Sequence, residues 1–478
     1  MAPAFILPVM TTGPGSLAPS RLRSDAARRS YAPVLPLLGK LRESGHEAWL
    51  VGGGVRDLLL GRAVKDWDIA TSATPEEVMS LWPSAPTGIK HGTVTAILPG
   101  QTVEITTFRT EGPYSDGRRP DWVRPASRLE DDLARRDFTV NAIAFDPESE
   151  ELRDPEGGVA DLAARRLRTV GDPDVRFGED GLRPLRGIRF AAVLEFTLEE
   201  ETRAAMRRAR DVVARVARER VRDELMKLLA APRPSVGIEL LRETGLLELL
   251  VPELLEGVGM EQNRWHAYDV YEHSLRSLDA APADRPLVRL AALLHDVGKP
   301  RTRVVVNGEG TFHRHEQAGE ELTDRILERL RFSGSERETV ARLVREHLFH
   351  YTPDWSDASV RRFLRRVGSE NLEDLFALRE ADDAAHGTGL DSRAGLLDLK
   401  RRIATTRERA EALRVEDLAV SGREVMALLG LPPGPRVGEV LRRLLEQVLE
   451  DPSRNTQETL LDLCRRVDPR LDDPERGA

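Results

Sequence analysis

Two aspartates lie one residue apart in the segment WLVGGGVRDLLLGRAVKDWDIATSA, Trp49 to Ala73. On a strand, Asp66 and Asp68 would point to the same face, because successive side chains alternate. Two oxygen ligands that lie so close together suit Mg²⁺ in phosphoryl or nucleotidyl transfer. Solvated acids on an edge strand would produce the same pattern, so the pair needs support from its surroundings.

A glycine turn upstream of the aspartates supplies that support. Gly52 to Gly54 lie between a predicted strand, Ala48 to Val51, and a predicted helix, Val55 to Leu60. Backbone N–H groups at such a helix start attract phosphate, and Arg56 adds a charged donor. Most glycine turns bind nothing, but the turn and the aspartate pair together favour nucleotidyl transfer. Glu104, on another strand-like run, is either a third carboxylate or a surface acid.

A second group of charged residues follows about a hundred residues later. Arg183, Arg186 and Arg189 recur every third residue, so on a helix they form one slowly rotating basic stripe. Asp180 lies three residues before the first of them. Carboxylate and guanidinium groups together offer the acceptors and donors needed to read the Watson–Crick edge of cytosine or adenine. A solvated, salt-bridged helix face would show the same spacing.

A third group consists of histidines and aspartates, which are good ligands for divalent transition metals. Its members are His273, His295, Asp296, His315, His347 and Asp382, with Asp383 as an alternative to Asp382. Separate helices can bring such groups together, although an isolated His-Asp pair is usually structural.

The elements that must position these groups change character along the chain. Short strand-like runs, turns and one or two helices predict an α+β domain at the start, and long Leu-, Ala- and Arg-rich segments predict helices from Asp174 onward. The predicted divisions are a flexible leader (1–30), an α+β head (31–172), a helical neck (173–260), a histidine-containing helical domain (261–390) and a helical tail (391–478).

Composition sets outer limits on the function. The 478 residues are enough for several domains, and the net charge of −9 argues against a protein that coats nucleic acid indiscriminately. The single cysteine excludes a disulfide within the chain and favours a reducing, cytoplasmic setting. We find no apolar run long enough for a membrane span and no signal peptide pattern.

The motifs resemble those of the class II tRNA nucleotidyltransferases, the family of the CCA-adding enzymes, which also includes the bacterial poly(A) polymerases. GGGVRD followed by KDWDIATSA resembles the family's first motif. Three later motifs agree in order: DLARRDFTVNAIAFD (132–146), RFGEDGLRPLRGIRF (176–190) and RERVRDELMKLL (218–229). The order H, HD, H, H, D in the later region resembles the HD superfamily of metal-dependent phosphohydrolases.

The resemblance implies a polymerase-beta-like head, an all-α neck, an HD domain and a helical tail that binds tRNA. It also implies roles for the candidate residues. Gly53 and Arg56 would contact the nucleotide, and Asp66 and Asp68 would hold two Mg²⁺ ions. Arg136, or its neighbour Arg135, would bind the triphosphate, Asp180 and Arg183 would select the base with support from Glu179, and Arg186 and Arg189 would face phosphate. In the HD domain, His273, His295, Asp296 and Asp382 would hold a divalent transition metal.

We therefore expect template-independent addition of C, C and A to the 3′ end of tRNA from CTP and ATP in the cytoplasm. The polar segment TFRTEGPYSDGRRPDWV (107–123) resembles the flexible loop of enzymes that add both C and A, whereas family members limited to CC addition tend to have lost it. The alternatives are a poly(A) polymerase, a specialist for CC or for A, and an HD phosphohydrolase whose head only binds RNA. The sequence does not predict an oligomeric state.

Overall fold

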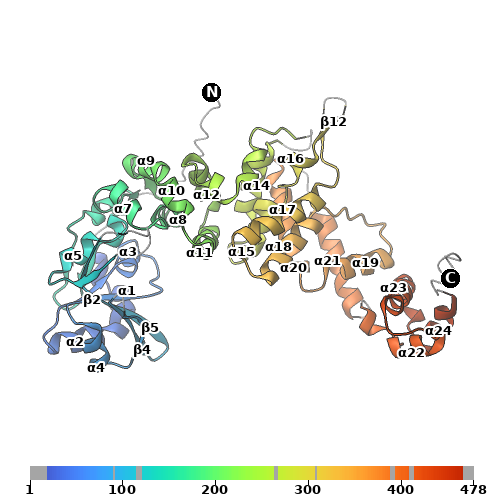
Figure 1. Ribbon diagram of the computed structural model, residues 1–478, viewed down its shortest axis with the longest axis horizontal. Coiled ribbons are helices and arrows are strands. Elements are labelled where there is room, and N and C mark those ends of the chain that lie inside the picture. Colours follow the sequence, from blue (N-terminus) through green and yellow to red (C-terminus); the bar gives the residue numbers. More distant parts are fainter. Residues whose placement is uncertain are drawn as a thin grey trace. The chain divides into compact units, whose positions relative to one another are not determined.

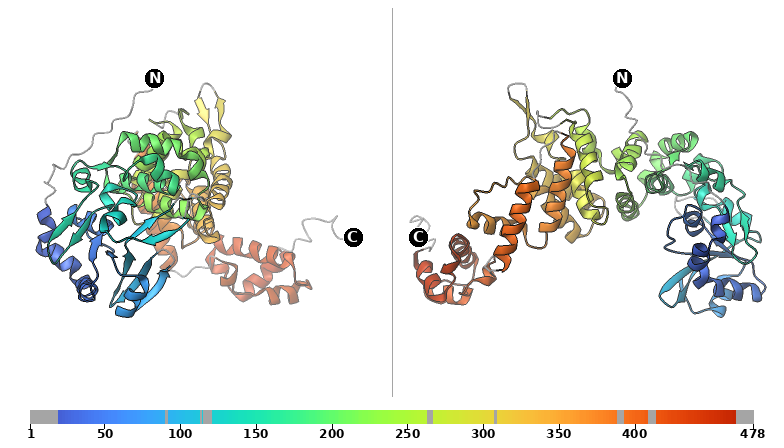
Figure 2. Two further views of the ribbon diagram at one scale, coloured as in Figure 1. Left: turned by 60° about the vertical axis from the view of Figure 1, so that its left-hand side comes forward. Right: turned by 180° about the vertical axis from the view of Figure 1, so that it is seen from behind.

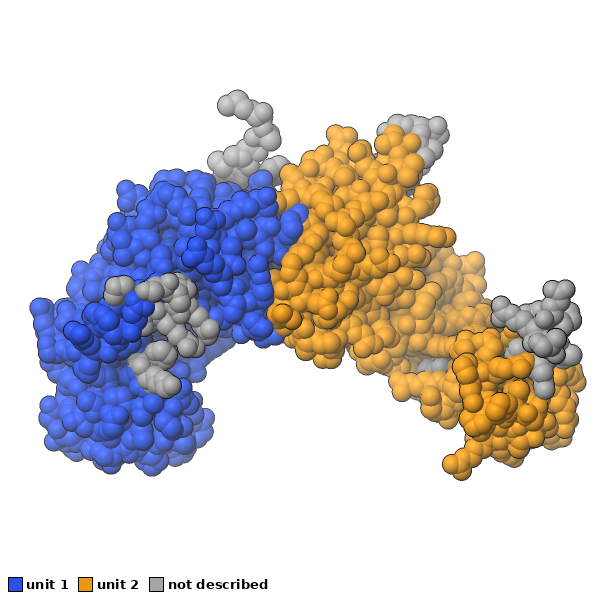
Figure 3. All heavy atoms as spheres, viewed as in Figure 1, with its two compact units in different colours: residues 1–252 blue, residues 253–478 orange. Residues whose placement is uncertain are grey.

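The computed structural model describes residues 19–89, 92–112, 114, 121–262, 267–306, 309–387, 393–408 and 414–466. The chain divides into two compact units, Met1–Pro252 and Glu253–Ala478 (Figure 3). The aspartate pair and the arginine stripe belong to unit 1, and the histidine cluster belongs to unit 2.

Unit 1 contains a mixed sheet, part of which is labelled in Figure 1 and drawn again in Figure 2. It has seven strands in the order β3-β4-β5-β2-β1-β8-β9. Its strands are β1 (Ala48–Val51), β2 (Asp68–Thr71), β3 (Ser84–Gly88), β4 (Thr93–Leu98), β5 (Gln101–Thr107), β8 (Ala144–Asp146) and β9 (Glu151–Arg153). The central pair β2 and β5 is parallel, whereas β1 pairs with β2 and β8 in antiparallel fashion. Strands β1 and β2 are mostly buried, whereas β5 alternates between buried and more exposed residues, so one side of it faces away from the core.

The head contains more helices than the one or two predicted from the sequence. They are α1 (Asp25–Tyr31), α2 (Leu35–Glu43), α3 (Gly53–Leu59), α4 (Pro75–Leu81), α5 (Leu129–Ala134) and α6 (Gly158–Ala163). Several are only six or seven residues long, too short for a clear helical period in the sequence. Helix α1 buries Ala27 and Tyr31, so the folded head includes residues that we assigned to the leader.

The segment 107–123, predicted as a loop, contains strand β6 (Arg109–Glu111), which pairs with β7 (Val123–Pro125) at its far end. Residues 113 and 115–120 of this loop lie outside the described residues. The structure therefore does not test its predicted flexibility.

The helices that follow the sheet in unit 1 lie within the segment 173–260, for which we predicted a helical neck. They are α7 (Pro173–Glu179), α8 (Arg183–Leu194), α9 (Glu200–Arg208), α10 (Arg210–Ala214), α11 (Arg218–Leu229), α12 (Pro234–Glu243) and α13 (Leu247–Leu250). Proline occupies the first turn of α7, α8 and α12, where its missing N–H costs nothing. Helix α8 packs against α11, and this pairing positions the arginine stripe.

The described part of unit 2 is helical apart from a small ribbon, β12 (Val304–Val306) and β13 (Glu309–Thr311). Its first helices are α14 (Val270–Ala280), α15 (Pro286–Leu294), α16 (Lys299–Thr302), α17 (His315–Arg329), α18 (Gly334–Glu346), α19 (Asp357–Val367) and α20 (Leu372–Ala385). Helix α15 is buried on nearly all sides, because its sequence PLVRLAALL is apolar around the whole helix. The His-Asp pair that follows α15 therefore lies at the centre of the bundle.

The end of the chain forms a smaller helical bundle with its own core. After α21 (Arg393–Glu408) come α22 (Gly422–Leu429), α23 (Pro435–Glu450) and α24 (Gln457–Arg466). Gly430 ends α22 in the left-handed conformation, and α23 begins at Pro435, so the predicted Gly/Pro break separates two helices. The sole cysteine, Cys464, is buried in this core. The α+β head followed by helical domains confirms the predicted fold class.

Candidate active site and metal cluster

Asp66 and Asp68 open onto one cavity of about 1270 Å³ in unit 1. Strand β2 begins at Asp68, so Asp66 precedes the strand that we predicted to contain both residues. The alternation nevertheless holds, because Trp67 and Ile69 are buried while both aspartates line the cavity. The structure thus brings the two carboxylates to the same side.

Glu104 is the third carboxylate at this wall of the cavity. It lies directly opposite Asp68 in the parallel β2–β5 pair and also lines the cavity. Burial raises the pKa of Asp68 to about 6; Arg136 opposes this rise, and Glu104 and Asp66 add to it. A divalent cation would relieve this repulsion, and the all-oxygen donor set fits Mg²⁺.

Gly52 lets an arginine and an aspartate approach the turn before α3. The helix begins at Gly53, so Gly52 alone of the three glycines lies outside it, which makes the turn tighter than we predicted. Gly52 has a φ of 73°, and a Cβ there would lie 2.9 Å from Arg136 Nη1 and 3.3 Å from Asp68 Oδ2. Only glycine suits both this conformation and this spacing.

The arginines predicted to bind the nucleotide are fixed at the cavity wall. Arg56 Nη1 donates to Asn141 Oδ1 at 2.6 Å, and Arg136 Nη1 donates to the Asn141 carbonyl at 3.3 Å. Arg136 also pairs with the fully buried Asp132, whose other oxygen accepts from Arg135. Arg56, Arg136 and Gly53 all line the cavity, as a nucleotide-binding role requires.

Asp180 and Arg183, the predicted base-reading pair, line the same cavity as the aspartates. Asp180 follows the last residue of α7 and Arg183 begins α8, so a single turn holds both. Arg183 Nη1 contacts Glu179, the residue predicted to support it, and donates to the Arg176 carbonyl at 3.1 Å. Its Nη2 donates to the Arg135 carbonyl at 3.3 Å.

The remaining arginines of the stripe are paired with acids. Arg186 donates twice to Asp137, at 2.9 and 2.7 Å, and Arg189 donates to Glu224 at 2.6 Å. Although Asp137 is buried, Arg186 and Asn141 hold the pKa of its carboxyl well below the ordinary value. Both arginines line the cavity, but their charges are largely compensated, and their predicted phosphate contacts stay a prediction.

The predicted HD ligands converge in the core of unit 2. His273 Nε2 lies 2.9 Å from Asp382 Oδ1 and 3.2 Å from His295 Nε2. Asp296 Oδ2 lies 3.3 Å from His295 Nε2 and 3.7 Å from His273 Nε2. Such separations are those of donor atoms around one metal ion with bonds of about 2.0–2.2 Å. Arg379 pairs with both Asp382 and Asp383, but it is Asp382 whose Oδ1 also lies 2.9 Å from His273 Nε2 and 3.5 Å from His295 Nε2, so the geometry favours Asp382 over Asp383.

The other oxygen of Asp296 faces a second set of donors. His315 Nε2 lies 3.4 Å from Asp296 Oδ1 and 3.4 Å from His347 Nε2. The Nδ1 atoms of His295, His315 and His347 each lie within 2.8 Å of the carbonyl oxygen three residues earlier. This bonding fixes the tautomer and leaves the Nε2 lone pairs for the cluster.

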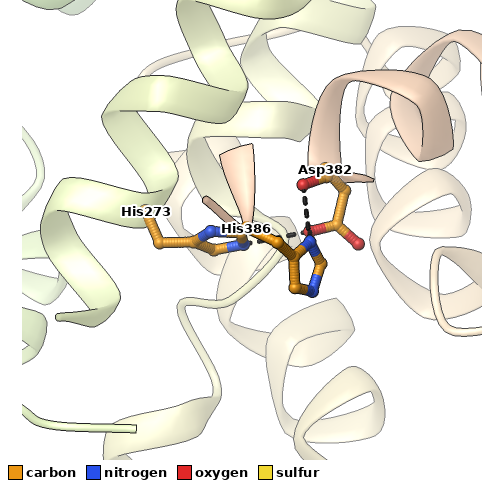
Figure 4. Close-up of side chains that lie close together, drawn as sticks. All are labelled: His273, Asp382 and His386. Carbon is orange, nitrogen blue, oxygen red and sulfur yellow. Dashed lines mark hydrogen bonds and ion pairs between the residues drawn. The ribbon is translucent and has the colours of Figure 1, made fainter. Parts of the chain in front are cut away.

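Sequence reasoning missed two residues beside this cluster. His386 directly follows the last residue of α20, four residues after Asp382, and completes a group of three with Asp382 and His273 (Figure 4). The spacing of four residues was the signal that could have identified it. Lys299 Nζ contacts Asp296 Oδ2 at 2.6 Å in the buried interior, so it offsets part of the carboxylate charge.

Family models match the chain in three consecutive segments. They describe a poly A polymerase head domain over residues 48–168, a probable RNA- and SrmB-binding site of polymerase A over 195–257, and an HD domain over 263–385. Together with the carboxylate pair on the mixed sheet, these matches define the chain as an enzyme of the nucleotidyltransferase class with an attached HD domain.

The chain belongs to the tRNA nucleotidyltransferase family. It is 42% identical to the A-adding tRNA nucleotidyltransferase of Deinococcus radiodurans over 84% of this chain and 91% of that one. It is 34% identical to the CCA-adding enzyme of Anoxybacillus flavithermus over 90% and 96% of the two chains. The crystal structure of the Bacillus stearothermophilus CCA-adding enzyme in complex with CTP matches with a TM-score of 0.69 at 30% identity, over 94% and 99% of the chains. These matches confirm the predicted family. Among the described residues, none of the helices has the length and apolar character that crossing a membrane requires.

Proposed function

We propose that the protein adds C, C and A to the 3′ end of tRNA from CTP and ATP. The observation that carries this proposal is that one cavity is lined both by the carboxylates Asp66 and Asp68 and by the base-reading pair Asp180 and Arg183. A CCA-adding relative at 34% identity, matched over 96% of its length, supports it. We further propose that tRNA is the polymeric partner, that the helical tail contacts it, and that the enzyme is cytoplasmic.

Two groups of cavity residues would divide the work of the reaction, namely the carboxylates and the arginines. The 3′ oxygen of the RNA attacks the α-phosphorus of the nucleotide, and pyrophosphate leaves. Asp66 and Asp68 would hold two Mg²⁺ ions, which supply charge neutralisation for the attacking and leaving oxygens. Arg136 and Arg56 orient the triphosphate, and because Asp132 and Asn141 fix them before substrate arrives, little reorganisation is needed on binding.

An enzyme that adds only the terminal A is the second candidate. The observation that favours it is the 42% identity to the A-adding enzyme of Deinococcus radiodurans over most of both chains. Both candidates would use the residues in the roles described above. They differ in the tRNA ends that they extend.

One assay separates these functions. Purified protein is incubated with Mg²⁺, labelled CTP or ATP, and tRNA transcripts that end at the discriminator base, at C or at CC. We expect C on the first two transcripts and a single A on the third. Incorporation of A on the CC transcript alone would support the A-adding specialist. Long A tails on every transcript would contradict both and indicate a poly(A) polymerase.

For the HD domain we propose a divalent transition metal held by His273, His295, Asp296 and Asp382. The convergence of these nitrogen and oxygen donors supports metal binding. The metal would activate a water for hydrolysis of a phosphomonoester or a 2′,3′-cyclic phosphate. Release of phosphate from a phosphomonoester, or opening of a 2′,3′-cyclic phosphate to a monoester, by the wild type but not by His295→Ala would support hydrolysis. Neither reaction with Ni²⁺, Mn²⁺, Co²⁺ or Zn²⁺ would restrict the domain to a bracing role.

A further inference from the structure

A bidentate ion pair ties the base-reading aspartate to a helix that sequence reasoning left without a role. Arg220, in the first turn of α11, donates from Nη1 to Asp180 Oδ1 at 3.2 Å and from Nη2 to Asp180 Oδ2 at 2.8 Å. The two side chains are 28% and 17% exposed, and both line the cavity. Arg220 therefore contacts the group that must meet the incoming base.

Packing places this pair in a fixed position. Gly181 lies so close to the neck that a Cβ there would be 2.6 Å from the Val212 carbonyl oxygen of α10. One turn after Arg220, Glu224 is buried and accepts from Arg189 of α8. Helix α11 thus places Arg220 against Asp180 and Glu224 against Arg189. These two ion pairs together define the register of α11 against α8.

The hydrogen bonds of Asp180 determine what it can still accept. A carboxylate offers about four lone-pair positions. In the described part of the chain, Asp180 Oδ1 accepts from the Leu182 N–H at 2.9 Å and from Arg220, and Oδ2 accepts from Arg220. One position on Oδ2 remains.

Arg183 complements that single acceptor. Three of its five N–H donors go to Glu179, the Arg176 carbonyl and the Arg135 carbonyl within the described residues. The pair therefore presents one acceptor and two donors. Cytosine and adenine carry an amino donor beside a ring-nitrogen acceptor, whereas uracil and guanine carry a carbonyl oxygen beside an N–H.

We propose that Arg220 is a positioning residue that sets base specificity by fixing the Asp180 carboxylate and occupying two of its acceptor positions. This inference rests on the proposed nucleotidyl transfer. Without Arg220 the carboxylate rotates about its broad terminal torsion and offers three free positions, so it no longer discriminates an amino group in one place.

The test uses the full-length protein with tRNA acceptors and each of the four nucleotides. We expect Arg220→Met, which keeps an unbranched chain, to raise KM for CTP and ATP and to lower kcat/KM about tenfold or more, as lost hydrogen-bonding groups do. The ratio of UTP to CTP incorporation should rise about tenfold. Arg220→Lys, which keeps the charge but not the fork, should fall between.

The matched control is Arg208→Met, which removes a bidentate arginine–aspartate pair, with Asp174, from the same helix α7 that Asp180 follows. It should leave the UTP to CTP ratio unchanged. If Arg220→Met lowers the rates for all four nucleotides equally, or leaves the ratio at the wild-type value, the specificity role is wrong and Arg220 is only structural. If the variant does not fold, the ratio for Arg220→Lys decides in the same way. A wild type that adds no nucleotide would instead contradict the proposed function itself.

Discussion

The carboxylate of Asp68 is held where its charge is unfavourable until a cation arrives. Burial and the neighbouring Glu104 and Asp66 raise its pKa to about 6, despite the attraction of Arg136. Such strain is common where a site is built for a ligand instead of for stability. The energetic cost of this site in the free protein is therefore measurable.

Asp68→Asn should abolish nucleotide addition and yet stabilise unit 1 in EDTA at neutral pH. Because the pKa of Asp68 is raised from 3.8 to about 6, the folded state binds a proton more tightly than the unfolded state, and stability falls as pH rises between these values. The asparagine lacks this penalty, so its advantage should be near zero at pH 4 and on the order of 2 kcal/mol above pH 7. Urea unfolding at both pH values measures it, and an equal advantage at pH 4 would contradict the charge explanation.

Gly52→Ala tests how closely Arg136 and Asp68 must approach the turn. The new Cβ would force Arg136 Nη1 away from 2.9 Å, so we expect the rate of addition to fall at least tenfold. Gly100→Ala is the matched control, because Gly100 also has a positive φ, of 80°, but open space around its Cβ. Gly100→Ala should lose about 1–2 kcal/mol of stability through its positive φ, and Gly52→Ala should lose more because its Cβ also meets Arg136, whereas only Gly52→Ala should lose activity.

At the scale of elements, the sequence was informative wherever a motif coincided with one turn. The Gly52 turn, the Asp66–Asp68 alternation and the Asp180–Arg183 spacing are local, so their geometry follows from strand and helix periods. The partners of the stripe could not be predicted, because Asp137 and Glu224 lie far from Arg186 and Arg189 in sequence. Arg220 was missed for the same reason, since only the packing of α11 reveals its contact with Asp180.

The histidine cluster connects three helices, because its side chains come from α14, from the end of α15 and from α20. We expect His295→Ala to lower the bound transition metal, measured by elemental analysis after loading with Ni²⁺ or Zn²⁺, by about one ion per chain. The melting temperature of the loaded protein should fall as well, because metal that binds only the folded state stabilises it. His350→Ala, which alters a histidine outside the cluster, is the control and should retain the wild-type metal content. Equal metal content in both variants would contradict the proposed ligand.

At the scale of the whole molecule, the two candidate sites lie in separate compact units, Met1–Pro252 and Glu253–Ala478. The described residues that line the cavity around Asp66 and Asp68 all belong to the first unit, and the described histidine cluster lies entirely within the second. Their ligand chemistry also differs, because one site offers oxygen donors and the other offers mainly imidazole nitrogen. The metal requirement of the cavity in unit 1 should therefore be independent of the metal bound by the histidine cluster in unit 2.

Pretreatment with 1,10-phenanthroline, followed by its removal and addition of Mg²⁺, should leave the rate of nucleotide addition within about twofold of the untreated protein, because this chelator binds transition metals far better than Mg²⁺. The same treatment should abolish any opening of 2′,3′-cyclic phosphates to phosphomonoesters until a transition metal is restored. The His295→Ala variant should add nucleotides at the wild-type rate with or without the chelator, because His295 does not line the cavity that would hold Mg²⁺. Loss of addition after chelation, restored by Ni²⁺ or Zn²⁺ but not by Mg²⁺, would show that the metal cluster of unit 2 supports the transfer reaction after all.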